Sequence, residues 1–219
     1  MPDLIRPGLR RRLDRELSGR AFHDAFTRGR YATDASIYQV MPAAVVIPRT
    51  MDDVALALDA AREEDLSLTA RGGGSSQCGQ TVNSGIVCDF SRHLNRILEL
   101  DVEGRRAVVE PGIVLDELNR QLKPHGLWFP VDVSTASRAT IGGMAANNSC
   151  GARSLRYGIM RDNVLSIEAL MADGSSRRFG EIATGSNDAL ASDLVALGVR
   201  EADEIAARFP QVSRRVGGY

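Results

Sequence analysis

The sequence has almost no lysine. Of its 27 basic residues only Lys123 is a lysine and the others are arginine, which we interpret as a coding bias and not as a functional feature. The 28 acidic residues bring the formal net charge to −1. A balance of this kind gives no reason to expect a nucleic acid or an acidic membrane surface as partner.

Long apolar runs and cysteine clusters are also missing. No uninterrupted apolar stretch approaches the roughly 20 residues of a membrane-spanning helix, so we predict no transmembrane segment. Cys78, Cys88 and Cys150 have no C-x-x-C spacing and no nearby pair of histidines. We therefore expect free thiols in a reducing compartment and no metal site.

The patterning predicts an α+β protein, with helix–strand units early in the chain and hairpins later. Residues 1–36 read as helical turns, because Leu9, Leu13 and Leu17 recur every four residues. Thr50 is the expected N-cap of the helix that follows it. The remaining predicted elements are strands at 45–48, 66–70 and 86–90, hairpins at 97–112 and 166–180, and helices at 50–65, 114–126 and 187–208.

Residues 74–81, GSSQCGQT, lack one residue of a nucleotide-binding P-loop. Gln80 stands where G-x-x-x-x-G-K-[ST] requires lysine, and glutamine puts no positive charge on a phosphate. The dinucleotide fingerprint G-x-G-x-x-G fails as well, because Gln77 replaces its third glycine and no helix pattern follows. What remains is a strand ending at Arg71, three glycines and two serines, which suit a pyrophosphate cradle. The alternative is a mobile surface loop.

A second glycine-rich segment spans residues 129–164. It gathers small residues, amides and hydroxyls around Gly142, Gly143 and Gly151, with few side chains that would build a core. Such a composition is expected where the backbone and small polar groups line a ligand. The alternative is a long surface loop, although ordered loops of this length are uncommon unless they are functional.

Four motifs occur in order: RGGGSSQCGQ, VEPGIVLDEL, DVSTASRATIGGMAANNSCGARSLRYG and DNVLSIEALMADG. From about Val45 to Tyr219 the chain resembles the FAD-linked oxidase family, with its vanillyl-alcohol oxidase and p-cresol methylhydroxylase type of FAD-binding domain. Within the family it is most similar to flavin-dependent D-2-hydroxyacid dehydrogenases acting on D-lactate or D-2-hydroxyglutarate. SRHLNRILELD and RATIGGMAANNSCGARSLRYG favour the large bacterial branch, whose members carry an iron–sulfur domain after the flavoprotein part.

The resemblance implies which residues hold the cofactor. The residues expected at the FAD pyrophosphate are Gly72, Gly73, Gly74, Ser75 and Ser76. Gly79 is expected to shape the return of the loop. Those expected to approach the cofactor from the second segment are Asp132, Ser134 and Thr135. Those expected along the ribityl chain and flavin ring are Thr140, Ile141, Gly142, Gly143, Asn147, Ser149 and Gly151. Because Ser75 follows the glycines where some relatives use histidine for a covalent link, we predict non-covalent FAD.

The resemblance also implies a division of the chain and a reaction. We expect an N-terminal helical extension at 1–36, a first FAD-binding subdomain at 37–110, and a second, C-terminally incomplete one at 111–219. The implied enzyme is an FAD-dependent oxidoreductase that oxidises the CH–OH group of a D-2-hydroxyacid by hydride transfer to flavin N5. Family members continue further, so we expect an N-terminal fragment, inactive alone, from a protein that is cytoplasmic or peripheral to the inner face of the membrane.

No catalytic residue is assigned. The histidines lie outside both glycine-rich segments, and the glutamates considered as bases are expected to be ordinary surface charges; these residues are His23, His93, His125, Glu110, Glu117 and Glu168. Three alternatives stay open: the FAD domain of another enzyme of the same fold (a carbohydrate or alcohol oxidase, or an alkyl-glycerone-phosphate synthase-like enzyme), a non-catalytic nucleotide-binding module, and a structural scaffold whose glycine loops hold nothing.

Overall fold

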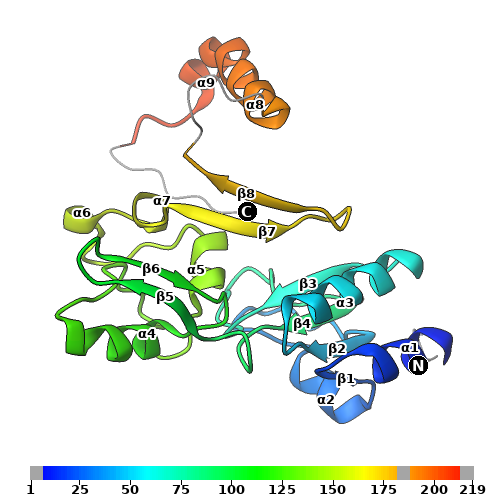
Figure 1. Ribbon diagram of the computed structural model, residues 1–219. Helices are drawn as coiled ribbons and strands as arrows, with labels where there is room; N and C mark the ends of the chain where they lie inside the picture. The colour runs from blue at the N-terminus through cyan, green and yellow to red at the C-terminus, as the bar shows by residue number, and fades with distance from the viewer. Residues whose placement is uncertain (1–6, 182–187, 213–219) are drawn as a thin grey trace.

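The computed structural model describes residues 7–181 and 188–212. Two α+β halves lie side by side, with a β-hairpin across one side of them and two helices beyond it (Figure 1). The first half has a four-stranded sheet in the order β1-β2-β4-β3, in which β2, β4 and β3 are parallel and β1 is antiparallel to β2. Its elements are α1 (Pro7–Glu16), β1 (Arg20–Phe22), α2 (Ala25–Arg30), β2 (Ala44–Ile47), α3 (Met51–Glu63), β3 (Leu68–Arg71) and β4 (Ile86–Asp89).

Both faces of this sheet are covered. Val46 and Cys88 belong to a core cluster that includes residues of α1 and α3. Val45 and Val87, which alternate with them along β2 and β4, pack on the other face with Tyr31. The near-continuous apolar sequence of the two inner strands follows from this burial on both sides.

The second half contains an antiparallel hairpin, helix α4 and three short helices around a separate core cluster. The second hairpin, β7–β8, and helices α8 and α9 follow it in the chain. The elements are β5 (Ile97–Asp101), β6 (Arg106–Val109), α4 (Leu115–Leu122), the 3₁₀ helix η1 (Lys123–His125), α5 (Ile141–Ala146), α6 (Ser154–Tyr157), α7 (Met160–Asn163), β7 (Ser166–Leu170), β8 (Ser176–Gly180), α8 (Ala189–Arg200) and α9 (Ala202–Arg208). Of these described helices none is long and apolar enough to cross a membrane.

Most predicted elements are confirmed, namely α1, β2 to β6, the helices starting near Thr50 and Val114, the hairpin turning at Asp173 and Gly174, and the C-terminal helices. Asn187, where the last helical pattern begins, lies outside the described residues. The predicted division at residues 36 and 110 stays a proposal. The core clusters give it a physical basis, although Leu9 and Leu13 of α1 are buried in the first cluster.

Two predictions are wrong. The first 36 residues are not all helical turns, because Arg20–Phe22 pairs with β2 as strand β1. The second glycine-rich segment is neither without structure nor poor in core residues. It contains α5, α6 and α7, and Ile141, Met144 and Met160 are buried in the second cluster. Short helices rich in glycine and alanine carry too weak a periodicity to be read from the sequence.

The N-cap of α3 provides a stability test. The Thr50 hydroxyl accepts a hydrogen bond from the Asp53 main-chain N–H at 3.2 Å. We expect Thr50→Ala to lower the free energy of unfolding by about 1 kcal/mol, because it leaves a first-turn N–H without its acceptor. Urea denaturation measures this, with the exposed Ser137→Ala as control. Equal stability of the two variants would contradict the cap.

Candidate functional site

The glycine loop, residues 72–81, begins where β3 ends at Arg71 and lies directly against the second glycine-rich segment. A Cβ atom added to Gly72 would be 2.0 Å from Thr140 Oγ1, and one added to Gly73 would be 2.2 Å from the Arg138 carbonyl oxygen. Both distances are far below van der Waals contact, so only glycine allows this approach. The fold therefore brings the two glycine-rich segments together, although about 60 residues of chain separate them.

Six successive main-chain N–H groups of this loop have no acceptor within the described part of the chain. They belong to residues 72–77, and the next N–H, of Cys78, donates to Ser76 Oγ at 3.3 Å. Unpaired N–H groups in a glycine-rich turn form a concave site for anions. The arrangement suits a phosphate or diphosphate group.

The C-terminal end of the loop contacts residues 31–39, which we call the N-terminal segment. Gly79 has a φ of +78°, and a Cβ there would be 2.6 Å from the Tyr38 ring. Thr81 Oγ1 donates to Asp34 Oδ2 at 3.0 Å, and Ser76 Oγ contacts Gln80 Oε1 across the loop. Asp34 and Tyr38 could not be predicted from the sequence, because they lie some 40 residues from the glycines and belong to none of the four motifs.

Thr140 is the central residue of the second segment. It is buried, bridges to Val114, and caps α5 by accepting from the Gly143 N–H at 3.4 Å. The next two residues are also engaged within the protein: the Ile141 N–H donates to Ile113 and the Gly142 N–H to Pro111, at 2.9 and 2.8 Å. The Ile141 side chain is part of the core. Their cofactor role stays a prediction.

Asp132 holds the end of the same segment in place. Its Oδ1 accepts from the Arg153 N–H at 3.0 Å, and a Cβ on Gly151 would be 2.2 Å from its carbonyl oxygen. Ser149 is buried and accepts at Oγ from Asn147 Nδ2 at 3.0 Å. The four predicted residues thus form two pairs, Asp132 against Gly151 and Asn147 with Ser149.

Three predicted residues of this segment have exposed side chains: Asn147, and Ser134 and Thr135 in the turn before Arg138. The Thr135 carbonyl accepts from the N–H groups of Arg138 and Ala139 at 2.8 and 2.7 Å. Their hydroxyls therefore remain on the surface, while the turn fixes residues 138–140 behind the glycine loop.

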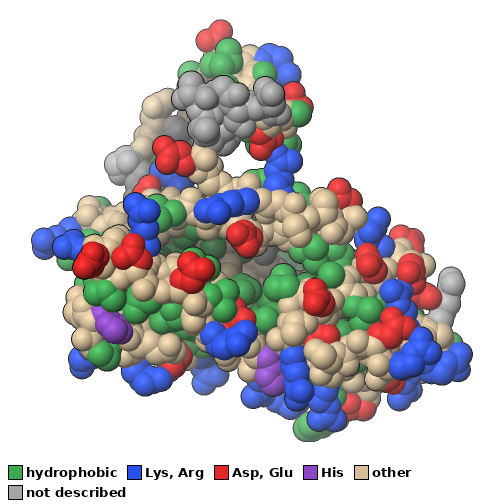
Figure 2. Space-filling view, in the orientation of Figure 1, with side chains coloured by type: hydrophobic (Ala, Val, Ile, Leu, Met, Phe, Trp, Pro, Cys, Tyr) green, Lys and Arg blue, Asp and Glu red, His purple; other side chains and the backbone are tan. Residues whose placement is uncertain are grey.

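Two hollows open on the second half, and neither includes the glycine loop. One, of about 490 Å³, lies between β5 and α4 and includes Arg96 and Glu117. The other, of about 400 Å³, lies between α5, α7 and the β7–β8 hairpin and includes Met160, Arg161 and Phe179. The surface is also recessed between the two halves, below β7–β8 (Figure 2).

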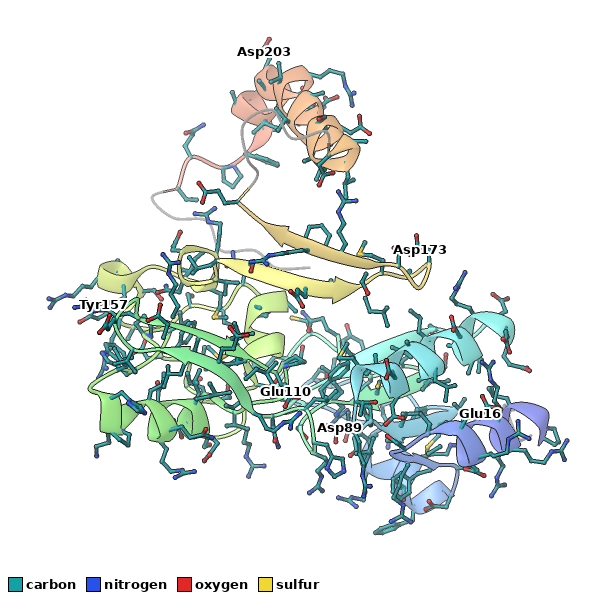
Figure 3. All side chains as sticks on the ribbon, viewed as in Figure 1. Glu16, Asp89, Glu110, Tyr157, Asp173 and Asp203 are labelled. Atoms are coloured by element: carbon teal, nitrogen blue, oxygen red, sulfur yellow. The ribbon has the colours of Figure 1, made fainter. Side chains whose placement is uncertain are left out.

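Glu110 is not the surface charge that the sequence suggested. It is buried near the junction of the two halves (Figure 3). Its carboxylate accepts from the Arg96 N–H at 2.8 Å and from the guanidinium at 2.9 and 3.1 Å. The bonds from Arg96 lower the pKa of Glu110, against the opposing effect of burial. A carboxylate held in this way is a structural ion pair and a poor proton acceptor.

Proteins from several organisms are similar to most of this chain. Residues 42–180 match the family model described as "FAD binding domain". D-2-hydroxyglutarate dehydrogenase from Pantoea ananatis is 41% identical over 201 residues, which cover 86% of this chain and 20% of the relative. The enzyme of the same name from Escherichia coli is 46% identical over 146 residues, covering 65% and 14%. The chain thus spans about a fifth or less of these relatives.

The fold has a counterpart among solved structures. Alkyldihydroxyacetonephosphate synthase superimposes with a TM-score of 0.74 at 21% identity, over 86% of this chain and 37% of that one. An identity this low bears on the fold alone. It establishes that the two α+β halves and their order are those of a known architecture.

Proposed function

The chain belongs to the FAD binding domain family, and on that premise we propose that it is the FAD-binding portion of a dehydrogenase that oxidises a D-2-hydroxyacid. The observation that carries the proposal is the contact between the glycine loop and residues 138–140, together with the six N–H groups of the loop that have no acceptor among the described residues.

The groups present fit the diphosphate of FAD. Gly72, Gly73 and Gly74 allow close approach of the backbone, and Ser75 has a hydroxyl without a partner among the described residues. We propose that the loop binds the diphosphate, with Ser76 and Gly79 shaping its return. For Asp132, Ser134 and Thr135 we propose an approach to the cofactor from the second segment, and for the predicted residues of 140–151 a position along the ribityl chain and flavin ring.

FAD, when bound, supplies the hydride-accepting chemistry, while the protein binds and orients. The name shared by the relatives at 41% and 46% identity favours D-2-hydroxyglutarate as the hydroxyacid, with D-lactate as the second candidate. We assign no general base to these residues. We further propose that the whole protein is cytoplasmic or peripheral to the inner membrane face, and that it carries an iron–sulfur domain.

Titration of the purified chain with FAD tests the function. We expect saturable binding and a flavin absorbance spectrum. No binding of FAD or ADP would overturn the proposal, and binding of ADP without FAD would support a non-catalytic nucleotide-binding module instead. Full-length kinetics with D-2-hydroxyglutarate, D-lactate and a sugar then separates the dehydrogenase from a carbohydrate oxidase.

The mode of attachment is a separate prediction. Because Ser75 stands where some relatives have a histidine, we expect acid precipitation of the FAD-loaded chain to release all of the flavin into the supernatant. Flavin retained in the pellet would contradict non-covalent binding.

The chain without the rest of the enzyme is expected to keep its flavin oxidised when D-2-hydroxyglutarate is added. Bleaching of the visible flavin absorbance would contradict this prediction.

A further inference from the structure

The guanidinium of Arg71 lies inside the curve of the glycine loop. Nη1 donates to the carbonyl oxygens of Tyr31 and Thr81 at 3.2 and 3.3 Å, and Nη2 donates to that of Thr33 at 2.8 Å. Gly74 has a φ of +62°, and a Cβ there would be 2.5 Å from Nη2. One side chain therefore joins the start of the loop, its far end and the N-terminal segment.

All the described hydrogen-bond partners of this guanidinium are main-chain carbonyls. Among the described residues no carboxylate lies within ion-pair distance of it. The two carboxylates whose charge acts on it, Asp89 and Asp34, are hydrogen-bonded to other groups. Asp89 accepts from the Tyr31 hydroxyl and Ser91, and Asp34 accepts from Thr81 and Ser36. The positive charge of Arg71 is offset at a distance but is not paired by contact.

The buried ring of Tyr31 packs against the guanidinium of Arg71. Its central carbon is 5.2 Å from the centre of the Tyr31 ring, a cation–π distance. Tyr31 is itself buried, and its hydroxyl donates to Asp89 Oδ2 at 2.6 Å at the end of β4, near the centre of the molecule in Figure 3. Burial and the bond to Asp89 raise the pKa of Tyr31 to about 12, so the hydroxyl keeps its proton at neutral pH.

We propose that Arg71 is a positioning residue for the diphosphate, an inference that rests on the proposed function of the glycine loop. Its guanidinium fixes the curve of residues 72–81 and places a positive charge behind Gly74. This is the charge that a P-loop obtains from the lysine that Gln80 replaces. The planar guanidinium donates hydrogen bonds to three carbonyl oxygens and packs against an aromatic ring. A lysine ammonium does not reproduce this set of contacts.

Arg71→Gln, Arg71→Lys and the control Arg28→Gln test the proposal. Arg28 also holds an N-terminal carbonyl, that of Pro42 at 2.6 Å, but has no contact with the loop. We expect Arg71→Gln to weaken FAD and ADP about tenfold to a hundredfold, with Arg71→Lys between it and the wild type and Arg28→Gln unchanged. At saturating FAD, the Arg71→Gln spectrum is expected to match the wild type, because the ring site is intact.

Three results would overturn the proposal. One is unchanged ADP affinity in Arg71→Gln. Another is an Arg71→Lys variant that binds FAD and ADP as weakly as Arg71→Gln, with the melting temperatures of both variants lowered in proportion to the loss of affinity. This result would indicate a role in folding alone. A third is an altered flavin spectrum at saturation, which places Arg71 near the ring. A wild-type chain that binds neither FAD nor ADP would instead refute the proposed function, and the inference with it.

Discussion

Replacing Gly73 with valine is expected to abolish FAD binding, with the dissociation constant raised at least about a hundredfold. The new Cβ would be 2.2 Å from the Arg138 carbonyl oxygen. That carbonyl has little freedom to yield, because the Arg138 and Ala139 N–H groups donate to Thr135, and the Leu115 N–H donates to Ala139. The displacement therefore falls on the glycine loop and moves the N–H groups that we propose to bind the diphosphate.

Fluorescence titration with FAD measures the loss, and circular dichroism checks that the fold is retained. Gly73→Ala meets the same oxygen with a smaller side chain and is expected to lose about tenfold in affinity. Gly29→Ala is the matched control, since nothing lies within 4 Å of its added Cβ and its position in α2 makes alanine slightly stabilising. A Gly73→Val chain that binds FAD within threefold of the wild type would remove the cradle assignment.

The sequence was sufficient for elements whose signal is local. The leucines of α1 and α4 recur at helical spacing, Thr50 and Gly126 stand at the ends of predicted helices, and Asp173 and Gly174 mark a hairpin. In each case a few neighbouring residues determine the conformation. The glycine loop was recognisable for the same reason, because its glycines and serines are consecutive.

Features that depend on distant partners were not predictable in this way. Strand β1 has three residues and exists because β2 offers it an edge. Arg71 reads as an ordinary strand end until Tyr31 and Thr33 are placed beside it. Likewise, the sequence marks Ile141 only as part of a motif, and the fold is needed to reveal that its side chain is in the core.

Asp53→Ala is expected to lower the free energy of unfolding by about 3–5 kcal/mol, the largest stability effect we predict. Asp53 is buried at the first turn of α3. Its carboxylate accepts from the main-chain N–H groups of Ser18, Gly19 and Arg49 at 2.7, 3.0 and 2.8 Å, and from the Ser18 hydroxyl at 2.8 Å. Alanine leaves three N–H groups without this acceptor, two where the chain passes from α1 into β1 and one just before α3.

The neighbouring Asp52→Ala is the matched control. Asp52 is exposed in the same helical turn, so its removal costs only a favourable interaction with the helix dipole, about 0.3–1 kcal/mol. Urea denaturation of both variants at neutral pH measures the difference. Equal losses would mean that the carboxylate of Asp53 does not hold the α1–β1 corner against α3.

The pH dependence of the Asp53 effect follows from its hydrogen bonds. Burial acts to raise the pKa of Asp53, but the bonds from Arg49, Ser18 and Gly19 outweigh it and leave the pKa lowered. A carboxyl group with a depressed pKa in the folded state stabilises the protein above its unfolded pKa, about 4, and loses that contribution as the pH falls through the folded value. The difference in unfolding free energy between the wild type and Asp53→Ala is therefore expected to be constant from neutral pH to about pH 5 and to shrink below about pH 4. A difference that persists unchanged at lower pH would show that the lost stability comes from side-chain volume and not from the ionised carboxylate.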